Sequence, residues 1–291
     1  MLSIHHPHFA HRPPSDEGVA RVYHYTTVEG ARSIIAGRQL WASNLHYMND
    51  YTEYTHGIEA MQHLLHRMAH EAKGSERSAV LIEAASYINQ MRTRHIFATS
   101  FCESDDLLSQ WRGYADGGVA IGFIHDDLVQ ATLGQQFHLY KCIYTAEEKE
   151  EIGRRFIEAG CSPDTLENRE KAVENLVGEI LLLICAFFKH ESFWEEQEWR
   201  LVSQTAFEAY DEKRGFRTRG RDLIPYYKVA LGPHRAVDHN GNACLPFDEM
   251  VAGPRASDSD KRQLADAFMY LCFRERVRCT TVRLSRIPDR T

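Results

Sequence analysis

The sequence lacks paired cysteine motifs, long apolar runs and an excess of basic residues. Its seven cysteines are odd in number and include no C-x-x-C pair, which argues against a disulfide framework or a zinc ribbon. We therefore expect reduced thiols and a cytoplasmic protein. The longest apolar run, from Ile180 to Phe188, is about half as long as a membrane span, so no membrane partner is expected. The net charge of −7 gives no overall basic surface for nucleic acid.

Several catalytic and cofactor motifs are also missing. The sequence contains no G-x-G-x-x-G, no Walker loop, no G-x-S-x-G and no H-E-x-x-H. These absences give no sign of a Rossmann site, a P-loop, a hydrolase triad or a zinc protease. No metal cofactor is expected.

What remains is a chain of 291 residues with 43% hydrophobic and 26% charged residues, an ordinary composition for a globular protein. Residues 1–20 begin with a segment rich in histidine and proline, and we predict a flexible leader there. Residues 21–291 are predicted to form a single domain. Roughly nine short strands and six helices follow one another without regular β-α-β alternation, which predicts an α+β fold.

Two segments between the predicted strands differ from their surroundings. Residues 145–190 show helical periodicity and are predicted to be a helical insertion. The polar, glycine-containing segment from Arg214 to Arg221 is predicted to be a loop. Its four arginines are interpreted as a solvated surface, with a local track for nucleic acid as the alternative.

Near the start of the chain, the aromatic and β-branched run from Val22 to Thr27 predicts a strand. Thr26 and Glu29 have the spacing of a capping box, so we expect a helix to begin there. Backbone N–H groups at such a junction favour an anionic or phosphate-bearing ligand beside His24. The alternative is a packed histidine and a capping threonine.

The most charged stretch near an apolar run is Phe193 to Val202. Residues two apart on a strand share a face, so a strand from Glu196 to Ser203 places Glu196, Glu198 and Arg200 together. Two carboxylates and a base on one face form either a functional site or an edge strand whose charges pair with one another in solvent.

Several short pieces occur in an order that resembles a bacterial and phage family of unknown function, DUF2971. The resemblance covers residues 21–290. The pieces are Tyr23-His24-Tyr25-Thr26-Thr27, Asn49-Asp50 with Glu53, Thr99-Ser100-Phe101, Trp111 with Tyr114-Ala115-Asp116 and Gly118, Glu196-Gln197-Glu198-Trp199-Arg200, Gly253-Pro254, and Ser285-Arg286-Ile287-Pro288-Asp289-Arg290.

The order of the polar pieces is also similar to the ADP-ribosyltransferase fold. That fold carries a His or Arg on its first NAD-binding strand, a Ser-Thr-Ser-like strand end and a late Glu-x-Glu strand. Here the corresponding residues are His24, then Thr99 and Ser100, then Glu196 and Glu198. The similarity implies a split antiparallel sheet that binds NAD+ as a substrate between its halves, with helical insertions.

The same similarity implies roles for single residues. Glu198 would stabilise the oxocarbenium-like transition state, and Glu196 would orient or deprotonate the acceptor. His24 would hold ribose hydroxyls, and the backbone near Tyr25 and Thr26 would grip the carboxamide. The remaining implied contacts come from Ser100, which would support Glu198; from Tyr47, Trp41 or Trp111, which would stack on nicotinamide; and from Arg200, which would steer phosphate or pair with Glu198.

Three functions are compatible with these patterns. The first is a transferase that moves ADP-ribose from NAD+ to RNA, DNA or protein, in antiviral defence or a toxin system with an antitoxin partner. The second is a metal-dependent nuclease that uses Asp50, Glu53, Glu196 and Glu198 as oxygen ligands. The third is a noncatalytic sensor that binds a nucleotide or a phage protein.

Overall fold

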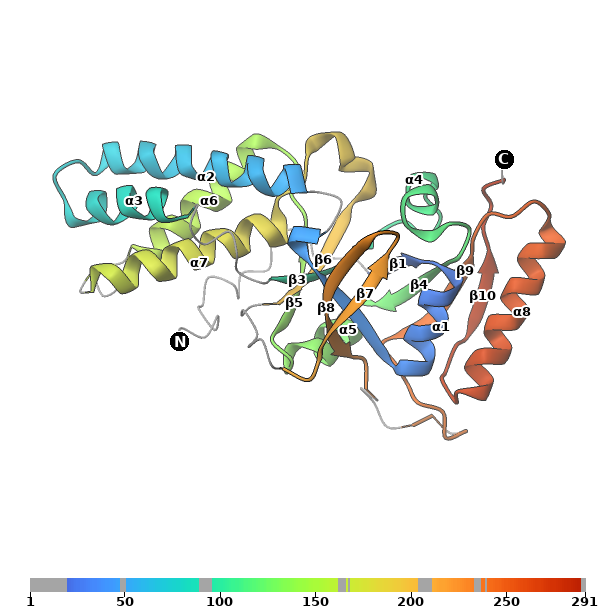
Figure 1. Cartoon of the computed structure of the whole chain (residues 1–291). Helices are drawn as coiled ribbons and strands as arrows, with labels where there is room; N and C mark the ends of the chain where they lie inside the picture. Colours follow the sequence, from blue (N-terminus) through green and yellow to red (C-terminus); the bar gives the residue numbers. More distant parts are fainter. Residues whose placement is uncertain are drawn as a thin grey trace.

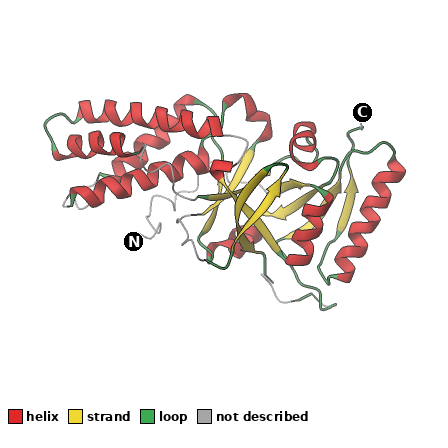
Figure 2. Ribbon diagram, in the orientation of Figure 1, coloured by secondary structure: helices red, strands yellow, loops and turns green. Residues whose placement is uncertain are grey.

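The computed structural model describes residues 20–47, 51–88, 96–161, 166, 168–203, 211–232, 237–238 and 240–288. These residues form a mixed α+β structure in which a sheet of ten strands is flanked by helices, as Figures 1 and 2 show. The predicted α+β class is confirmed. The predicted leader lies almost entirely outside the described residues, and the single domain over 21–291 stays a prediction.

The strands are short, four to nine residues each. They are β1 (Arg21–Thr26), β2 (Gln39–Asn44), β3 (Phe97–Cys102), β4 (Val119–Ile124), β5 (Phe137–Lys141), β6 (Glu198–Ser203), β7 (Arg214–Arg219), β8 (Asp222–Ala230), β9 (Phe247–Ala252) and β10 (Thr281–Leu284). The helices are α1 (Val28–Gly37), α2 (Tyr51–Glu71), α3 (Glu76–Tyr87), α4 (Leu108–Gln110), α5 (His125–Leu133), α6 (Ala146–Gly160), α7 (Arg169–Phe187) and α8 (Asp258–Arg274).

The sheet divides at β3. The main strand order is β10-β9-β4-β1-β3-β2-β8-β7, and the additional strands β6 and β5 extend from β3. On one edge of β3, β1 pairs only at Cys102, whereas β2 pairs only at Phe97 and Ala98. On the other edge, β6 pairs with β3 from Ala98 to Cys102. Strands β1 and β2 therefore separate along β3, and the sheet opens beside residues 99–101. Because β9 and β10 pair in parallel, the sheet is mixed, and the split antiparallel sheet expected from the ADP-ribosyltransferase similarity stays a prediction.

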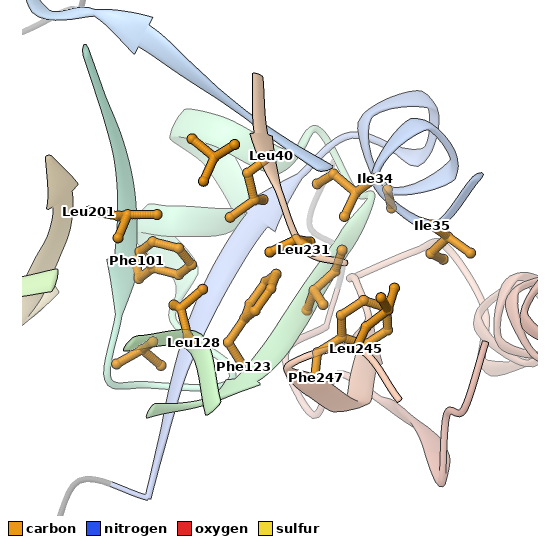
Figure 3. Packing of buried hydrophobic residues seen from close by; sticks show 14 of the residues in the cluster. Ile34, Ile35, Leu40, Phe101, Phe123, Leu128, Leu201, Leu231, Leu245 and Phe247 are labelled. Carbon is orange, nitrogen blue, oxygen red and sulfur yellow. The ribbon is translucent and has the colours of Figure 1, made fainter. Parts of the chain in front are cut away.

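One large apolar cluster fills the face of the sheet that α1, α5 and α8 cover, and Figure 3 shows part of it. Trp199 and Leu201 of β6 point into this cluster. The alternation of apolar and charged residues along β6 therefore sends the neighbouring Glu198 and Arg200 to the opposite face. That division of β6 into an apolar and a polar face was predicted correctly.

Four helices, α2, α3, α6 and α7, pack on one another at one end of the molecule (Figure 1). Helices α6 and α7 lie within the segment from 145 to 190, where helical periodicity was predicted. Their buried residues join Ala98 of β3 and Val202 of β6 in a second apolar cluster. This cluster covers one end of the polar face of β6, so the helices limit how far that face is open. Among the described helices, none combines the length and the apolar run needed to cross a bilayer.

Three local predictions are wrong. The segment from Arg214 to Arg219 is strand β7, not a loop, and it pairs with β8 through a tight turn at Gly220, where φ is +60°. Pairing with β8 satisfies its backbone groups despite its polar sequence. Thr27, not Thr26, caps α1, because its side chain accepts a hydrogen bond from the Gly30 N–H. Strand β6 begins at Glu198, because Gln197 has φ 40° and ends a short 3-10 helix over Glu191–Glu196.

Candidate functional site

The polar face of β6 centres on a buried ion pair. Arg200 donates two hydrogen bonds to Glu198, from Nε to Oε1 at 2.9 Å and from Nη2 to Oε2 at 3.1 Å. A third donor of the guanidinium, Nη1, bonds the Phe188 carbonyl at 3.2 Å. Glu198 is only 4% exposed. The bidentate geometry suits a planar guanidinium and fixes both side chains.

A second cation completes the cluster. The ammonium of Lys189 lies 3.1 Å from Glu198 Oε2 and 3.4 Å from Glu196 Oε2. Glu196 therefore reaches the same place as Glu198, although it lies before the strand and not on it. Lys189 is itself buried, and its ammonium lies 5.0 Å from the centre of the Phe193 ring. Two carboxylates and two cations thus neutralise one another away from solvent.

These contacts determine the charge of Glu198. Burial alone raises the pKa of a carboxyl group, but the charges of Arg200 and Lys189 outweigh it and hold the pKa of Glu198 at about 2. Glu198 is therefore ionised throughout the physiological range. A permanent carboxylate fits a role in stabilising positive charge and does not fit a role as a general acid.

Strand β3 brings Ser100 to this cluster. Ser100 pairs with Arg200 across the two strands, so both side chains lie on the polar face. The Ser100 hydroxyl lies near enough to help lower the pKa of Glu198. Its oxygen nevertheless meets no described group with good hydrogen-bond geometry and is shielded from water. The Ser100 hydroxyl therefore lies beside the Glu198 carboxylate without a well-aligned hydrogen bond to it.

His24 lies where β1 and β2 separate. Its Nδ1 lies 3.0 Å from the carbonyl oxygen of Ser100. A carbonyl only accepts hydrogen bonds, so Nδ1 carries the proton. Burial, the largest cause, lowers the pKa of His24 and keeps the imidazole neutral. Its Nε2 is then a hydrogen-bond acceptor, the property required to receive a hydroxyl group.

The β7–β8 hairpin approaches the same opening. Arg217 donates from Nη2 to the Ser43 hydroxyl of β2 at 2.8 Å, and its positive charge contributes to the lowered pKa of His24. Next on the hairpin, Arg219 donates to the carbonyl of Tyr47 at 3.1 Å. Trp41 and Tyr226 stack beside them with ring centres 4.2 Å apart. The opening is therefore bordered by a base and by a stacked aromatic pair, of which Trp41 is partly exposed and Tyr226 is buried.

The other residues predicted from sequence occupy different positions. The Tyr25 hydroxyl donates to the Ser104 carbonyl and accepts from the Leu107 N–H, both at 2.9 Å, so it fixes the loop after β3. Trp111 is 2% exposed, packs edge-on against Tyr25 and donates to Asp106, which leaves no open face for a ligand. Of the three aromatic residues predicted to stack on nicotinamide, Tyr47 and Trp41 are partly exposed, and the stacking itself stays a prediction.

A cavity of about 890 Å³ lies on the far side of Lys189. It runs between α2, the start of α6 and residues 188–191, and Tyr144 forms part of its wall. The Tyr144 hydroxyl accepts the Glu198 N–H at 2.7 Å. The cavity therefore lies against the residues that hold Glu198, and its other walls carry His56, His63, His66 and His190.

Sequence reasoning missed Lys189, Tyr144, Ser43 and Arg217 as parts of this region. Lys189 carried a usable signal, because it follows an almost entirely apolar helical stretch and a buried ammonium requires carboxylate partners. The other three carried none, since their positions depend on which strands become neighbours.

Of the proposed nuclease ligands, Asp50 and the Glu53 side chain lie outside the described residues. Within the described part of the chain, no three His, Cys, Asp or Glu side chains gather as a metal site.

Comparison with known proteins gives one match. The sequence profile of a family described as protein of unknown function (DUF2971) matches residues 110–201. The chain resembles DUF2971. The matched segment begins in α4 and ends in β6, so it includes both Glu198 and Arg200. The resemblance to DUF2971 expected from the short motifs is therefore confirmed over this segment. No curated protein and no solved structure matches the chain.

Proposed function

We propose that the protein is an NAD+-dependent ADP-ribosyltransferase that modifies a macromolecule. One observation carries the proposal. Ser100 of β3 contacts both of the other predicted site residues where the sheet opens between β1 and β2: its carbonyl oxygen lies 3.0 Å from Nδ1 of His24 on β1, and its side chain lies beside Glu198 and Arg200 of β6. A neutral imidazole with an acceptor nitrogen, a hydroxyl and a permanent carboxylate are groups that can bind a ribose and stabilise positive charge on it.

In the proposed reaction the bond between ribose C1′ and the nicotinamide nitrogen breaks, and nicotinamide leaves as a neutral molecule. The ribose ring then carries positive charge, as in glycoside transfer. Glu198 accepts a hydrogen bond from the 2′-hydroxyl and faces this charge, so it stabilises the transition state more than the ground state. The acceptor forms a new bond to C1′ and loses its proton, with Glu196 as the proposed base.

The burial of Glu198 imposes a condition on this reaction. Its carboxylate is covered by Lys189 and Arg200, so a ribose can reach it only when one of the two cations moves aside. Lys189 is the better candidate, because it makes one contact with Glu198 and also has Glu196 as a partner. Arg200 then remains to pair with Glu198 or to meet a phosphate.

The β7–β8 hairpin favours a nucleic-acid acceptor over a protein. Six lysines and arginines and three acidic residues lie between 211 and 230, so this hairpin is positive in a chain of net charge −7. Strand β7 lies at the edge of the sheet, and Phe216 on it is 66% exposed. Basic groups with exposed aromatic rings are the combination that binds single-stranded nucleic acid.

The test is a transfer reaction with labelled NAD+ and total cell extract, followed by separate digestion with nuclease and protease. We expect label that survives protease and is lost with nuclease. Glu198→Gln should reduce transfer and nicotinamide release at least about 100-fold, the size of effect seen when one transition-state-stabilising group is removed. The matched control is Glu195→Gln, which removes an exposed acid three residues away and should leave activity unchanged.

A noncatalytic binding module is the second candidate, because the same burial and neutralisation of Glu198 would suit a purely structural ion pair. Absence of both transfer and nicotinamide release in the wild-type protein, together with saturable binding of NAD+, would favour it. Nuclease activity that disappears with EDTA would instead support the metal-dependent alternative.

A further inference from the structure

Three cysteines line one cavity at the end of the molecule that contains α8 and β10. The cavity has a volume of about 650 Å³ and is lined by Cys244, Cys272 and Cys279, together with Met269 and Phe273. None of these residues takes part in the proposed transfer reaction. Cys272 is 2% exposed, whereas Cys279 is only half-buried. Small molecules that enter the cavity can therefore reach the half-buried thiol of Cys279, whereas the thiol of Cys272 is almost fully covered.

The chain folds back to bring two of these thiols together. Helix α8 ends at Arg274, and Arg276 adopts the left-handed conformation with φ 53°. The turn is closed by a hydrogen bond from the Val277 N–H to the Cys272 carbonyl at 2.9 Å. Cys279 then packs against the apolar cluster that contains Cys272, and its thiol donates a hydrogen bond to the Thr281 carbonyl at 3.4 Å. The two thiols lie close enough to change each other's acidity.

The two thiols differ in acidity. The neighbouring Cys272 thiol, the largest cause, lowers the pKa of the Cys279 thiol, although burial and the carboxylates of Asp248 and Glu249 oppose this. The neighbouring Cys279 thiol, together with burial, raises the pKa of the Cys272 thiol. Cys279, whose pKa is lowered, is thus the better nucleophile, and Cys272 is the thiol expected to react second.

We propose that Cys279 and Cys272 form a peroxide-reactive pair that closes to a disulfide. The Cys279 thiolate attacks one oxygen of a hydroperoxide, the O–O bond breaks, and the other oxygen leaves with a proton as water or an alcohol. The sulfur of Cys272 then attacks the resulting sulfenic acid, the S–O bond breaks, and water leaves. Two thiols and one hydroperoxide give one disulfide, one water and one further water or alcohol. The bond ties the end of α8 to the residues that lead into β10.

The experiment treats the folded full-length protein with hydrogen peroxide, alkylates the remaining thiols and identifies tryptic peptides by mass spectrometry. Trypsin cuts after Arg274, Arg276 and Arg278, so Cys272 and Cys279 fall on separate peptides. We expect these two peptides to be joined, with the loss of two hydrogens and of both alkylation sites. Cys244→Ser is the matched control, because it removes a thiol of the same cavity and should leave the link intact.

Two further variants distinguish the roles of the pair. Cys272→Ser should let a sulfenic acid accumulate on Cys279, where dimedone labels it, whereas Cys279→Ser should abolish dimedone labelling at both positions. The proposal is overturned if peroxide leaves both thiols of the wild-type protein alkylatable, or if Cys244 links to Cys279 as readily as Cys272 does. The wild-type measurement decides the question even if a serine variant fails to fold.

Discussion

Two clusters of carboxylates and cations in this molecule use similar residues in different surroundings. On β6, Glu198 lies between Arg200 and Lys189, whose side chains are 5% and 1% exposed. At the other end of the sheet, Arg283 of β10 bonds Glu249 of β9 and Asp105, and its side chain is 40% exposed. Solvent is excluded from the cluster around Glu198, whereas it reaches the cluster around Arg283.

This difference in exposure changes what each cluster contributes. A buried group of charges is held in one geometry and loses much stability when one member is removed. A half-exposed group is screened by solvent and contributes little. Arg283 therefore serves mainly to fasten β10 to the loop after β3, while the β6 cluster keeps Glu198 ionised in a fixed orientation. A site that stabilises a developing positive charge requires an ionised carboxylate held in a fixed orientation.

The largest effect is expected for Arg200→Met. The substitution removes the bidentate partner of Glu198 and leaves the Phe188 carbonyl without its donor, so we expect a loss of about 3–5 kcal/mol in the free energy of unfolding. Urea denaturation measures it. The control Arg155→Met removes an exposed arginine that pairs with Glu151 on α6, and it should change stability little. A small loss in Arg200→Met would mean that water reaches the β6 cluster.

The second prediction concerns acid. Because the pKa of Glu198 is lowered from 4.5 to about 2, the unfolded chain binds this proton first as the pH falls. The stability that the ionised group contributes is therefore complete above about pH 5 and is lost between about pH 4.5 and 2, with a total of about 3 kcal/mol. In Glu198→Gln this loss should be missing, so the gap in stability between wild type and variant should narrow towards pH 2. Parallel pH profiles in urea denaturation would contradict the lowered pKa.

Sequence alone predicted the parts of this site that depend on local order. The two-residue period of a strand placed Glu198 and Arg200 on one face and Trp199 on the other. Helical periodicity likewise gave the buried residues of α2, such as Ile58 and Met61. These patterns hold because each depends on neighbours within one element.

The other parts of the site could not be predicted from the sequence, because they depend on which strands lie next to one another in the sheet. Nothing in the sequence near Arg217 indicates that β7 pairs with β8 and carries this arginine to Ser43. The meeting of His24 with Ser100 requires β1 and β2 to separate along β3, which is a property of the whole sheet. The start of β6 was misplaced because the left-handed conformation of Gln197 has no signal in its neighbours, Glu196 and Glu198.

The smallest effect is expected for Arg283→Met, and its dependence on salt sharpens the comparison. The substitution removes ion pairs with Asp105 at 2.7 Å and with Glu249 at 3.1 Å. Because solvent screens these charges, the free energy of unfolding should fall by about 1 kcal/mol or less. Raising NaCl to about 1 M shortens the screening length to about 3 Å, so the difference from wild type should nearly vanish. The deficit of Arg200→Met should persist in the same urea titrations, because water and ions do not enter its cluster. Equal salt dependence of the two deficits would show that burial does not separate the two clusters.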